Sequence, residues 1–289
     1  MARPLAEAET VEIDLKALYD LDDAGERATQ ASRLVTEYSS AVTELSRIRK
    51  EALEELIGQG KTQTELAAML GMTRARVGQL LSSGPKSERA FLGTGTLTIA
   101  VGGKLEADKR GTGRVLAQED LAAFNRMQDL ARAMGLDAKS EVVEPPGMVN
   151  LNRDNLVIIC GPRLSPLISQ VLESDRNLGF EKDEQGWYLI DRPSGTIHRS
   201  PMDSGQNADI AYLGRLPRLD GRGSFLYIAG IHAIGAPGVV HYLENHLTEL
   251  YSEVKTRRFS VLISSTFDPK TLDITASERI SPLYRGEGA

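Results

Sequence analysis

Cysteine is almost absent from this chain: Cys160 is the only one among its 289 residues. A single cysteine excludes an internal disulfide framework and any cysteine-rich zinc site. The chain also lacks an uninterrupted apolar run of about 18 residues, the length that a membrane-spanning helix needs. Its first residues are acidic and contain no apolar core of signal-peptide length. We therefore expect a cytoplasmic protein with no membrane partner.

The common nucleotide-binding fingerprints are missing as well. No G-x-x-x-x-G-K-[S/T] occurs, and no G-x-G-x-x-G lies between an expected strand and an expected helix. His241 and His246 are five residues apart on an expected helix and so do not share a face. We assign no metal site and no certain cofactor; a nucleotide-like effector is a candidate ligand for the loops described below.

Charge is unevenly distributed along the chain. The formal net charge is -6, yet the segment from Arg27 to Ala90 carries ten basic and seven acidic residues. The first 26 residues carry eight acids against two bases. A mildly basic block between acidic neighbours is compatible with DNA binding, because the local field matters more than the total charge.

A long helix is expected from about Asp23 to Gln59, where proline is absent. Apolar residues recur there at spacings of three and four, which is a heptad pattern. This seam could pair with the same helix of a second subunit, so we expect a homodimer. Alternatively, the seam covers the small helical domain that follows. Its members are Ala31, Leu34, Tyr38, Ala41, Leu45, Ile48 and Ala52.

Two shorter helices are expected within "KTQTELAAMLGMTRARVGQLLSSG", from Lys61 to Gly84. Thr62 can cap the first helix, with Glu65 at the spacing of a capping box. Gly71 can adopt the left-handed conformation of a sharp turn, and Thr73 can cap the second helix. The apolar face of the first helix is expected to comprise Leu66, Ala67, Met69 and Leu70, and that of the second Val77, Leu80 and Leu81.

The stretch "TQTELAAMLGMTRARVGQLL" resembles the helix-turn-helix of sigma-factor region 4 and of many bacterial repressors. With "SSGPKSERAFLG" it resembles a group of actinobacterial sigma-like helix-turn-helix proteins. The resemblance implies that the second helix enters the major groove of double-stranded DNA, where Arg suits guanine and Gln suits adenine. Simple helix packing is the alternative. The candidate DNA-binding residues are Lys61, Thr62, Gln63, Thr73, Arg74, Ala75, Arg76, Gln79, Ser82 and Lys86.

Beyond Gly93 the chain alternates apolar, β-branched runs with amphipathic segments. Expected strands include "TLTIAV", "NLVIICG", "GWYLIDRP", "ADIAYLGRLPR", "SFLYIAG" and "RFSVLISSTF". Helices are expected at about 118–134, after Ser165, and at about 236–251. Such alternation predicts a mostly parallel, doubly wound α/β sheet. We place an all-α helix-turn-helix domain at residues 1–92 and a doubly wound α/β domain at residues 93–289.

Ligands of open α/β sheets bind beyond the carboxyl ends of the strands. Three glycine-containing loops follow the expected strands "TLTIAV", "NLVIICG" and "SFLYIAG". In the second of these loops, Arg163 could clamp a phosphate in bidentate fashion. Each of these residues also has a purely structural interpretation. The glycines could only make turns, Arg163 could pair with an acidic residue, and His232 could be buried in the core. The candidate ligand-binding residues are Gly102, Gly161, Pro162, Arg163, Ser165, Tyr212, Gly230, His232 and Gly235.

The phrases "IICGPRLSP", "SPMDSGQNADIAYLGRLPR" and "LYIAGIHAIGAPGVVHYLENHL" resemble the Rossmann-like C-terminal domain of the same actinobacterial group. This resemblance implies a sensor domain attached to the helix-turn-helix. Ser165, His232 and either Asp203 or Asp209 could form a hydrolase triad, but no G-x-S-x-G occurs. The three loops also contain no glutamate, so no catalytic residue is assigned.

Together these features predict a sequence-specific transcriptional regulator whose α/β domain senses a small effector containing a phosphate or nucleotide. The alternative is an enzyme acting on a nucleotide or NAD-like metabolite, with the helical domain used for targeting or assembly. A third hypothesis is that the α/β domain binds nothing small and serves only as a contact surface.

Overall fold

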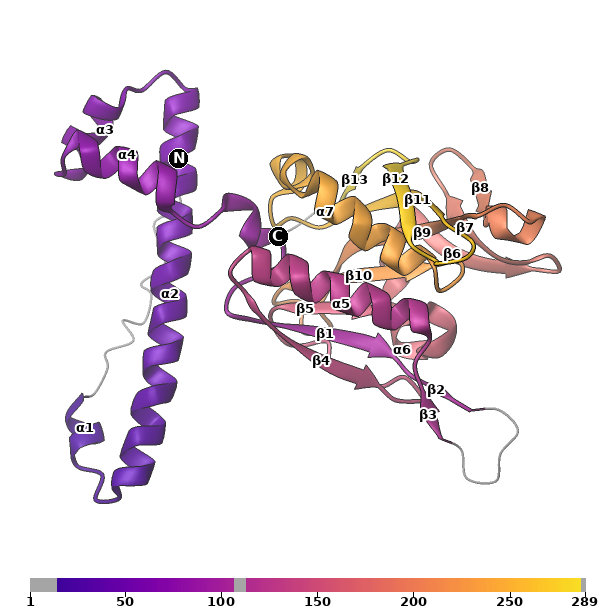
Figure 1. Cartoon of the computed structure of the whole chain (residues 1–289), viewed down its shortest axis with the longest axis horizontal. Coiled ribbons are helices and arrows are strands. Elements are labelled where there is room, and N and C mark those ends of the chain that lie inside the picture. Colours follow the sequence, from indigo (N-terminus) through magenta and orange to yellow (C-terminus); the bar gives the residue numbers. More distant parts are fainter. Residues whose placement is uncertain (1–14, 107–112, 287–289) are drawn as a thin grey trace.

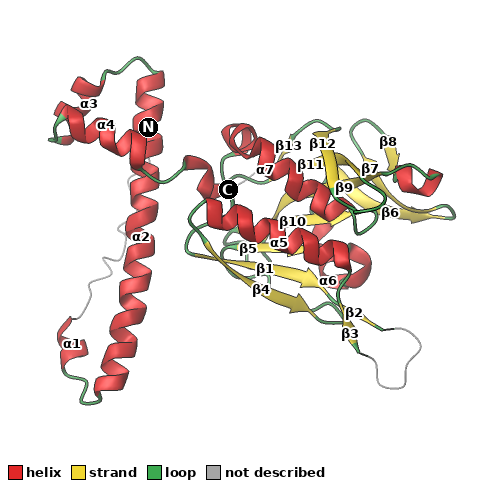
Figure 2. Cartoon of the chain, viewed as in Figure 1, coloured by secondary structure: helices red, strands yellow, loops and turns green. Residues whose placement is uncertain are grey.

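The computed structural model describes residues 15–106 and 113–286 and has two parts, an N-terminal helical region and a C-terminal α/β region (Figure 1). Figure 2 shows that the first part is helical and that the strands lie in the second part. The helical region comprises α1 (Leu15–Tyr19), α2 (Ala24–Gly58), α3 (Gln63–Leu70) and α4 (Arg74–Ser83). A short 3₁₀ turn, η1 (Ser87–Phe91), leads into the sheet.

Helix α2 is 35 residues long and begins at the cap Asp23, whose Oδ1 accepts a hydrogen bond from the Glu26 amide at 2.6 Å. The predicted long helix is therefore confirmed. At its carboxyl end α2 contacts the α/β region, where Arg47 donates to the Tyr251 hydroxyl at 3.2 Å. Glu51 accepts from the Lys255 ammonium at 2.5 Å and pairs with Arg47 at 2.7 Å. This four-residue polar junction ties α2 to the end of α7 (Gly235–Val254).

Helices α3 and α4 pack on the carboxyl half of α2 around a small core of Leu53, Leu66, Ala67 and Val77. The predicted capping box of Thr62 and Glu65, the left-handed Gly71 (φ 63°) and the Thr73 cap are all confirmed. Leu80 and Leu81 are partly buried against this core as expected. The predicted apolar face of α3 is wrong at Met69 and Leu70, which are exposed because α4 and α2 cover only the Leu66 side.

The C-terminal region is built on a mixed sheet in the order β12-β11-β9-β10-β5-β1-β4, with β13 paired to β11. A pair, β2-β3, and a three-stranded sheet, β6-β7-β8, lie outside it. The strands of the mixed sheet are β1 (Thr96–Gly102), β4 (Asp137–Val143), β5 (Leu156–Ile159), β9 (Ala208–Pro217), β10 (Ser224–Gly230), β11 (Phe259–Phe267), β12 (Ile274–Arg279) and β13 (Tyr284–Arg285). The other strands are β2 (Lys104–Leu105), β3 (Arg114–Val115), β6 (Leu178–Asp183), β7 (Gly186–Asp191) and β8 (Thr196–Arg199).

The expectation of a mostly parallel sheet is correct only for β4, β1, β5 and β10, which pair in parallel. Strand β9 runs antiparallel to both β10 and β11. The reason is local: a short turn reverses the chain directly from β9 into β10, and the Arg218 amide donates to Gly223 O across it at 3.0 Å. The result is a mixed α/β sheet.

Helices α5 (Gln118–Ala133) and α7 pack side by side over one face of the sheet (Figure 1). Helix α6 (Pro166–Leu172) and strands β6 and β7 add side chains to a second apolar cluster. Alternate residues of β5 divide between the clusters, since Val157 and Ile159 face α5 and α7 while Ile158 faces the second cluster. Apart from η1, the 3₁₀ turns are η2 (Pro162–Leu164) and η3 (Pro201–Ser204).

Over residues 15–106 and 113–286, no helix combines the length and apolar character that crossing a bilayer requires. The same residues hold no group of three or more His, Cys, Asp or Glu placed to bind a metal ion.

Candidate nucleic-acid interface and ligand site

The outward face of α4 carries the candidate base-contacting residues. Val77 is fully buried against the core of the helical region and anchors the opposite face. Arg74, Ala75, Arg76 and Gln79 are therefore exposed. Arg76 Nη1 donates to Gln79 Oε1 at 2.6 Å, which holds these two side chains beside each other on the surface. Figure 1 shows α4 on the side of α2 that lies away from the sheet.

The candidate phosphate-contacting residues surround this helix. Lys61, Ser82 and Lys86 are exposed, and Gln63 is half-buried. Thr62 and Thr73 are exposed but already accept the capping hydrogen bonds of α3 and α4. No acidic residue occurs from position 66 to position 87, whereas Arg74, Arg76 and Lys86 all do. The α4 surface is thus locally basic although the chain is acidic overall.

The carboxyl ends of β1, β5 and β10 meet at one edge of the sheet, because these strands run in parallel. Four predicted ligand-binding residues, Gly161, Arg163, Gly230 and His232, line a cavity there. Its volume is about 20 Å³. A water molecule needs about 10–15 Å³ of such space, so the cavity holds about one water.

Other predicted ligand-binding residues serve the fold at their positions. Ser165 is buried, caps α6 by accepting from the Ile168 amide at 3.3 Å, and donates to Gly147 O at 2.5 Å. The hydroxyl of Ser165 is thus hydrogen-bonded to Gly147 and Ile168, and not to His232. Tyr212 is buried in the second apolar cluster, and its hydroxyl donates to Asp175 Oδ2 at 2.8 Å. Neither side chain lines the cavity at the carboxyl edge.

The remaining predicted positions, all buried, lie in the same loops as the cavity. Gly102 ends β1 beside the Cys160 thiol, where a Cβ would lie 2.7 Å from Sγ. Gly235 begins α7, and a Cβ there would lie 2.6 Å from Asp209 Oδ2. Pro162 begins η2. These residues permit close backbone packing.

Two carboxyl groups with raised pKa lie at this edge. Burial is the main cause of the rise in the pKa of Asp120 to about 6, against the opposing charges of Lys104 and Arg163. Burial likewise raises the pKa of Asp209 to about 6, although its Oδ2 accepts from the His232 amide at 3.0 Å. A carboxyl with a pKa of about 6 keeps its proton to a higher pH than an exposed aspartate does, and it is mostly ionised at pH 7.

Cys160 and His232 complete the chemistry of the edge. Burial raises the pKa of the Cys160 thiol to about 12, so the thiolate that nucleophilic attack requires is scarce at neutral pH. His232 Nε2 lies 2.8 Å from Asp203 Oδ1, a pairing on the rim of the loop cluster. Two members of the triad considered from the sequence, His232 and Asp203, are therefore paired. The third, Ser165, is hydrogen-bonded to Gly147 instead.

Lys104 and Asp120 line the cavity and were not among the predicted residues. A signal for Asp120 is present in the sequence. The buried stripe of α5 comprises Asp120, Ala123, Met127, Leu130 and Ala131. A charged residue on an otherwise apolar helical stripe departs from the usual pattern and marks a position for closer study.

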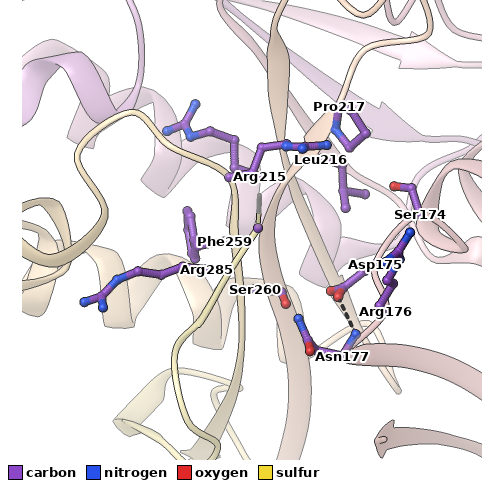
Figure 3. Close-up of a pocket in the computed structure, with 12 residues that line it drawn as sticks. Ser174, Asp175, Arg176, Asn177, Arg215, Leu216, Pro217, Phe259, Ser260 and Arg285 are labelled. Atoms are coloured by element: carbon purple, nitrogen blue, oxygen red, sulfur yellow. Dashed lines mark hydrogen bonds between the residues drawn. The ribbon is translucent and has the colours of Figure 1, made fainter. Parts of the chain in front are cut away.

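A larger cavity, about 510 Å³ in volume, lies at the opposite edge of the sheet, where β9 ends and β11 begins (Figure 3). None of the predicted ligand-binding residues lines it.

Comparison of the chain with protein-family models, with curated proteins and with solved structures finds no match.

Proposed function

We propose that this protein is a sequence-specific DNA-binding transcriptional regulator with an attached sensor of a small phosphate- or nucleotide-containing ligand. In this proposal α3 and α4 form a helix-turn-helix of the sigma-like type that the sequence resembles, and the α/β region is a Rossmann-like sensor domain. The supporting observation is the exposed face of α4, where Arg74, Arg76 and Gln79 project from a segment without acids.

The chemistry of this face suits base recognition. An exposed arginine can donate two hydrogen bonds to the O6 and N7 atoms of guanine in the major groove, and glutamine can pair with adenine. Lys61, Ser82 and Lys86 would contact phosphates, which orient a protein on the duplex without reading its sequence. The bond between Arg76 and Gln79 would exchange for base contacts on binding.

Dimerisation is part of the proposal and is supported by the surface of α2. Val35, Val42, Leu45 and Ile48 have exposed fractions of 66%, 61%, 65% and 49%. At 100° per residue they lie on one side of the helix, and Arg47 and Glu51, which contact α7, lie on another. An apolar stripe of this length is suited to a second copy of α2, which would place two α4 helices on one palindromic site.

The proposal is tested by selecting sites from genomic DNA with the full chain and measuring binding to them by fluorescence anisotropy. Arg74→Ala and Arg76→Ala should each lower discrimination between the selected site and random duplex by about 1–3 kcal/mol. Arg33→Ala is the matched control, because it removes an exposed arginine of α2. Equal affinity of the wild-type protein for the selected site and for random duplex would refute the proposal.

A second candidate function is favoured by the buried carboxyl groups of Asp120 and Asp209. Asp120 lines the sheet-edge cavity with Lys104 and Arg163, whereas Asp209 does not line it. Carboxyls with a pKa raised toward neutrality are typical of groups that transfer protons in enzymes. The chain would then act on a nucleotide or NAD-like metabolite, with the helical region used for targeting. Turnover by the full chain across a nucleotide panel, lost in Asp120→Asn, would support this alternative; its absence would count against it.

A further inference from the structure

The cavity at the end of β9 is lined by an unusual concentration of arginine. Arg176, Arg215, Arg258 and Arg285 all line it, and they come from four separate segments of the chain. Asp175 is the acidic residue that lines it. Figure 3 shows Arg176 on one side and Arg285 on the other, with Arg215 and Ser260 between them. The fold thus gathers positive charge that is scattered in the sequence.

Ion pairs compensate little of the charge of Arg176, Arg215 and Arg285. The Asp175 carboxylate already accepts hydrogen bonds from the Tyr212 hydroxyl at 2.8 Å and from the Asn177 amide at 2.9 Å. Within residues 15–106 and 113–286, neither Arg176 nor Arg215 forms an ion pair, and Arg285 approaches Glu253 only at 3.8 Å. The cavity therefore presents guanidinium groups whose charge an incoming anion would neutralise.

Arg215 is the central group. Its Nη2 donates to the carbonyl oxygen of Phe91 at 2.5 Å, and its guanidinium lies 5.0 Å from the centre of the Phe91 ring. Its Nε is buried without a hydrogen-bond partner among the described residues. Burial lowers the pKa of Arg215 to about 10, so the group is still charged at neutral pH. Arg215 as a whole is half-buried, and a partly desolvated charge without a counter-ion is unfavourable, so an anion in the cavity would relieve that cost.

We propose that this cavity binds a small polyanion with two or more linked phosphates, such as inorganic polyphosphate or a nucleoside di- or triphosphate. Guanidinium groups form paired hydrogen bonds with phosphate oxygens. One phosphate reaches one side of the cavity, whereas a linked chain extends from Arg176 past Arg215 toward Arg285. The 510 Å³ volume is within the range of about 300–1,000 Å³ that is usual for small-molecule sites.

The cavity lies next to the segment that connects the helical region to the sheet, so binding there could affect the helical region. Phe91 is the last residue of η1, in the short segment between α4 and β1. Its ring lies 5.7 Å from that of Phe259, which lines the cavity. A polyanion that draws the Arg215 guanidinium toward itself would weaken the bond to Phe91. An effect on DNA affinity through this contact rests on the proposed function; binding of the polyanion does not.

The binding test is isothermal titration calorimetry of the full chain with inorganic tripolyphosphate and, separately, with ATP. Arg176→Ala and Arg285→Ala should each weaken binding about tenfold or more, because each removes a charge-assisted contact at an exposed position where folding is not at stake. Arg222→Ala is the matched control, since it removes an exposed arginine that does not line this cavity. Its affinity should equal that of the wild-type protein.

Two results would overturn the proposal. One is the absence of binding of either probe to the wild-type chain. The other is binding that Arg163→Ala abolishes and that Arg176→Ala and Arg285→Ala leave unchanged, which would place the ligand in the loops at the carboxyl edge. Anisotropy with the selected DNA, with and without ATP, then tests the coupling. A protein that binds tripolyphosphate but no DNA would refute the proposed function and leave the polyanion site standing.

Discussion

Asp120 provides the sharpest prediction about stability. Its carboxyl is buried on the core side of α5, with a folded-state pKa of about 6 that burial has raised. An unfolded aspartate has a pKa of about 3.9. Below about pH 4 both states hold the proton, so the site has no effect on the free energy of unfolding. Between about pH 4 and pH 6 the unfolded state releases its proton and the folded state keeps it, so stability falls as pH rises.

The size of the loss follows from the two pKa values. A difference of about two units corresponds to about 3 kcal/mol, which is fully expressed above about pH 6. Asp120→Asn replaces the carboxyl by a neutral group of similar shape and abolishes this loss. Relative to wild type, the variant should therefore gain about 3 kcal/mol between about pH 4 and pH 7.5. The raised pKa of Asp209 also makes stability fall as pH rises. Both proteins contain Asp209, so its effect cancels when the stability of the wild type is subtracted from that of the variant.

Urea unfolding at several pH values, followed by Trp187 fluorescence, measures this difference. Trp187 is the only tryptophan of the chain and packs against the second apolar cluster, so its signal reports on the α/β region. Asp129→Asn is the control, because Asp129 is an exposed carboxylate of the same helix. A stability difference between Asp120→Asn and wild type that stays constant from about pH 4 to pH 7.5 would refute the reasoning.

Two further predictions concern packing. Leu45→Glu should shift the chain from dimer to monomer in sedimentation experiments, because it places a charge in the exposed stripe of α2, whereas Thr36→Glu, on the side of the helix opposite Leu45, should leave the dimer intact. A monomeric wild-type protein would contradict the dimer. Gly238→Ala should lower the free energy of unfolding by about 1–3 kcal/mol, since its Cβ would lie 2.0 Å from Ser265 Oγ. Gly58→Ala meets no atom within 4 Å and should have little effect in the same denaturation assay.

Local structure could be predicted from the sequence wherever the signal is itself local. The Thr62–Glu65 box, the Gly71 turn and the Thr73 cap each depend on residues within four positions, and all were found. Buried strands such as β10 were found from their continuous apolar runs. Strand β4 was missed, because its sequence, "DAKSEVV", is polar at an exposed edge of the sheet. Strand direction was also partly wrong, since apolar runs look the same in parallel and antiparallel pairs.

The candidate sites were less accessible to sequence analysis. Glycine-containing loops did indicate where Gly161 and Gly230 meet, because parallel strands must end at the same edge. Tyr212 could not be placed, since its position in β9 does not reveal that the ring turns into the core toward Asp175. The arginine cavity had no sequence signature, because segments far apart in the chain, such as those of Arg176 and Arg215, meet only after folding.

The polar junction of Arg47, Glu51, Tyr251 and Lys255 is the point about which α2 would tilt relative to the α/β region. It joins α2 to α7 through Arg47 and Glu51, with a further ion pair between Glu55 and Lys255 at 3.8 Å, while the helix itself is 35 residues long. The amino end of α2 lies about 37 Å beyond this point, so a tilt of about 5° there displaces it by about 3 Å. A slight shift at the end of α7 is thereby magnified into a movement comparable to the spacing between neighbouring base pairs.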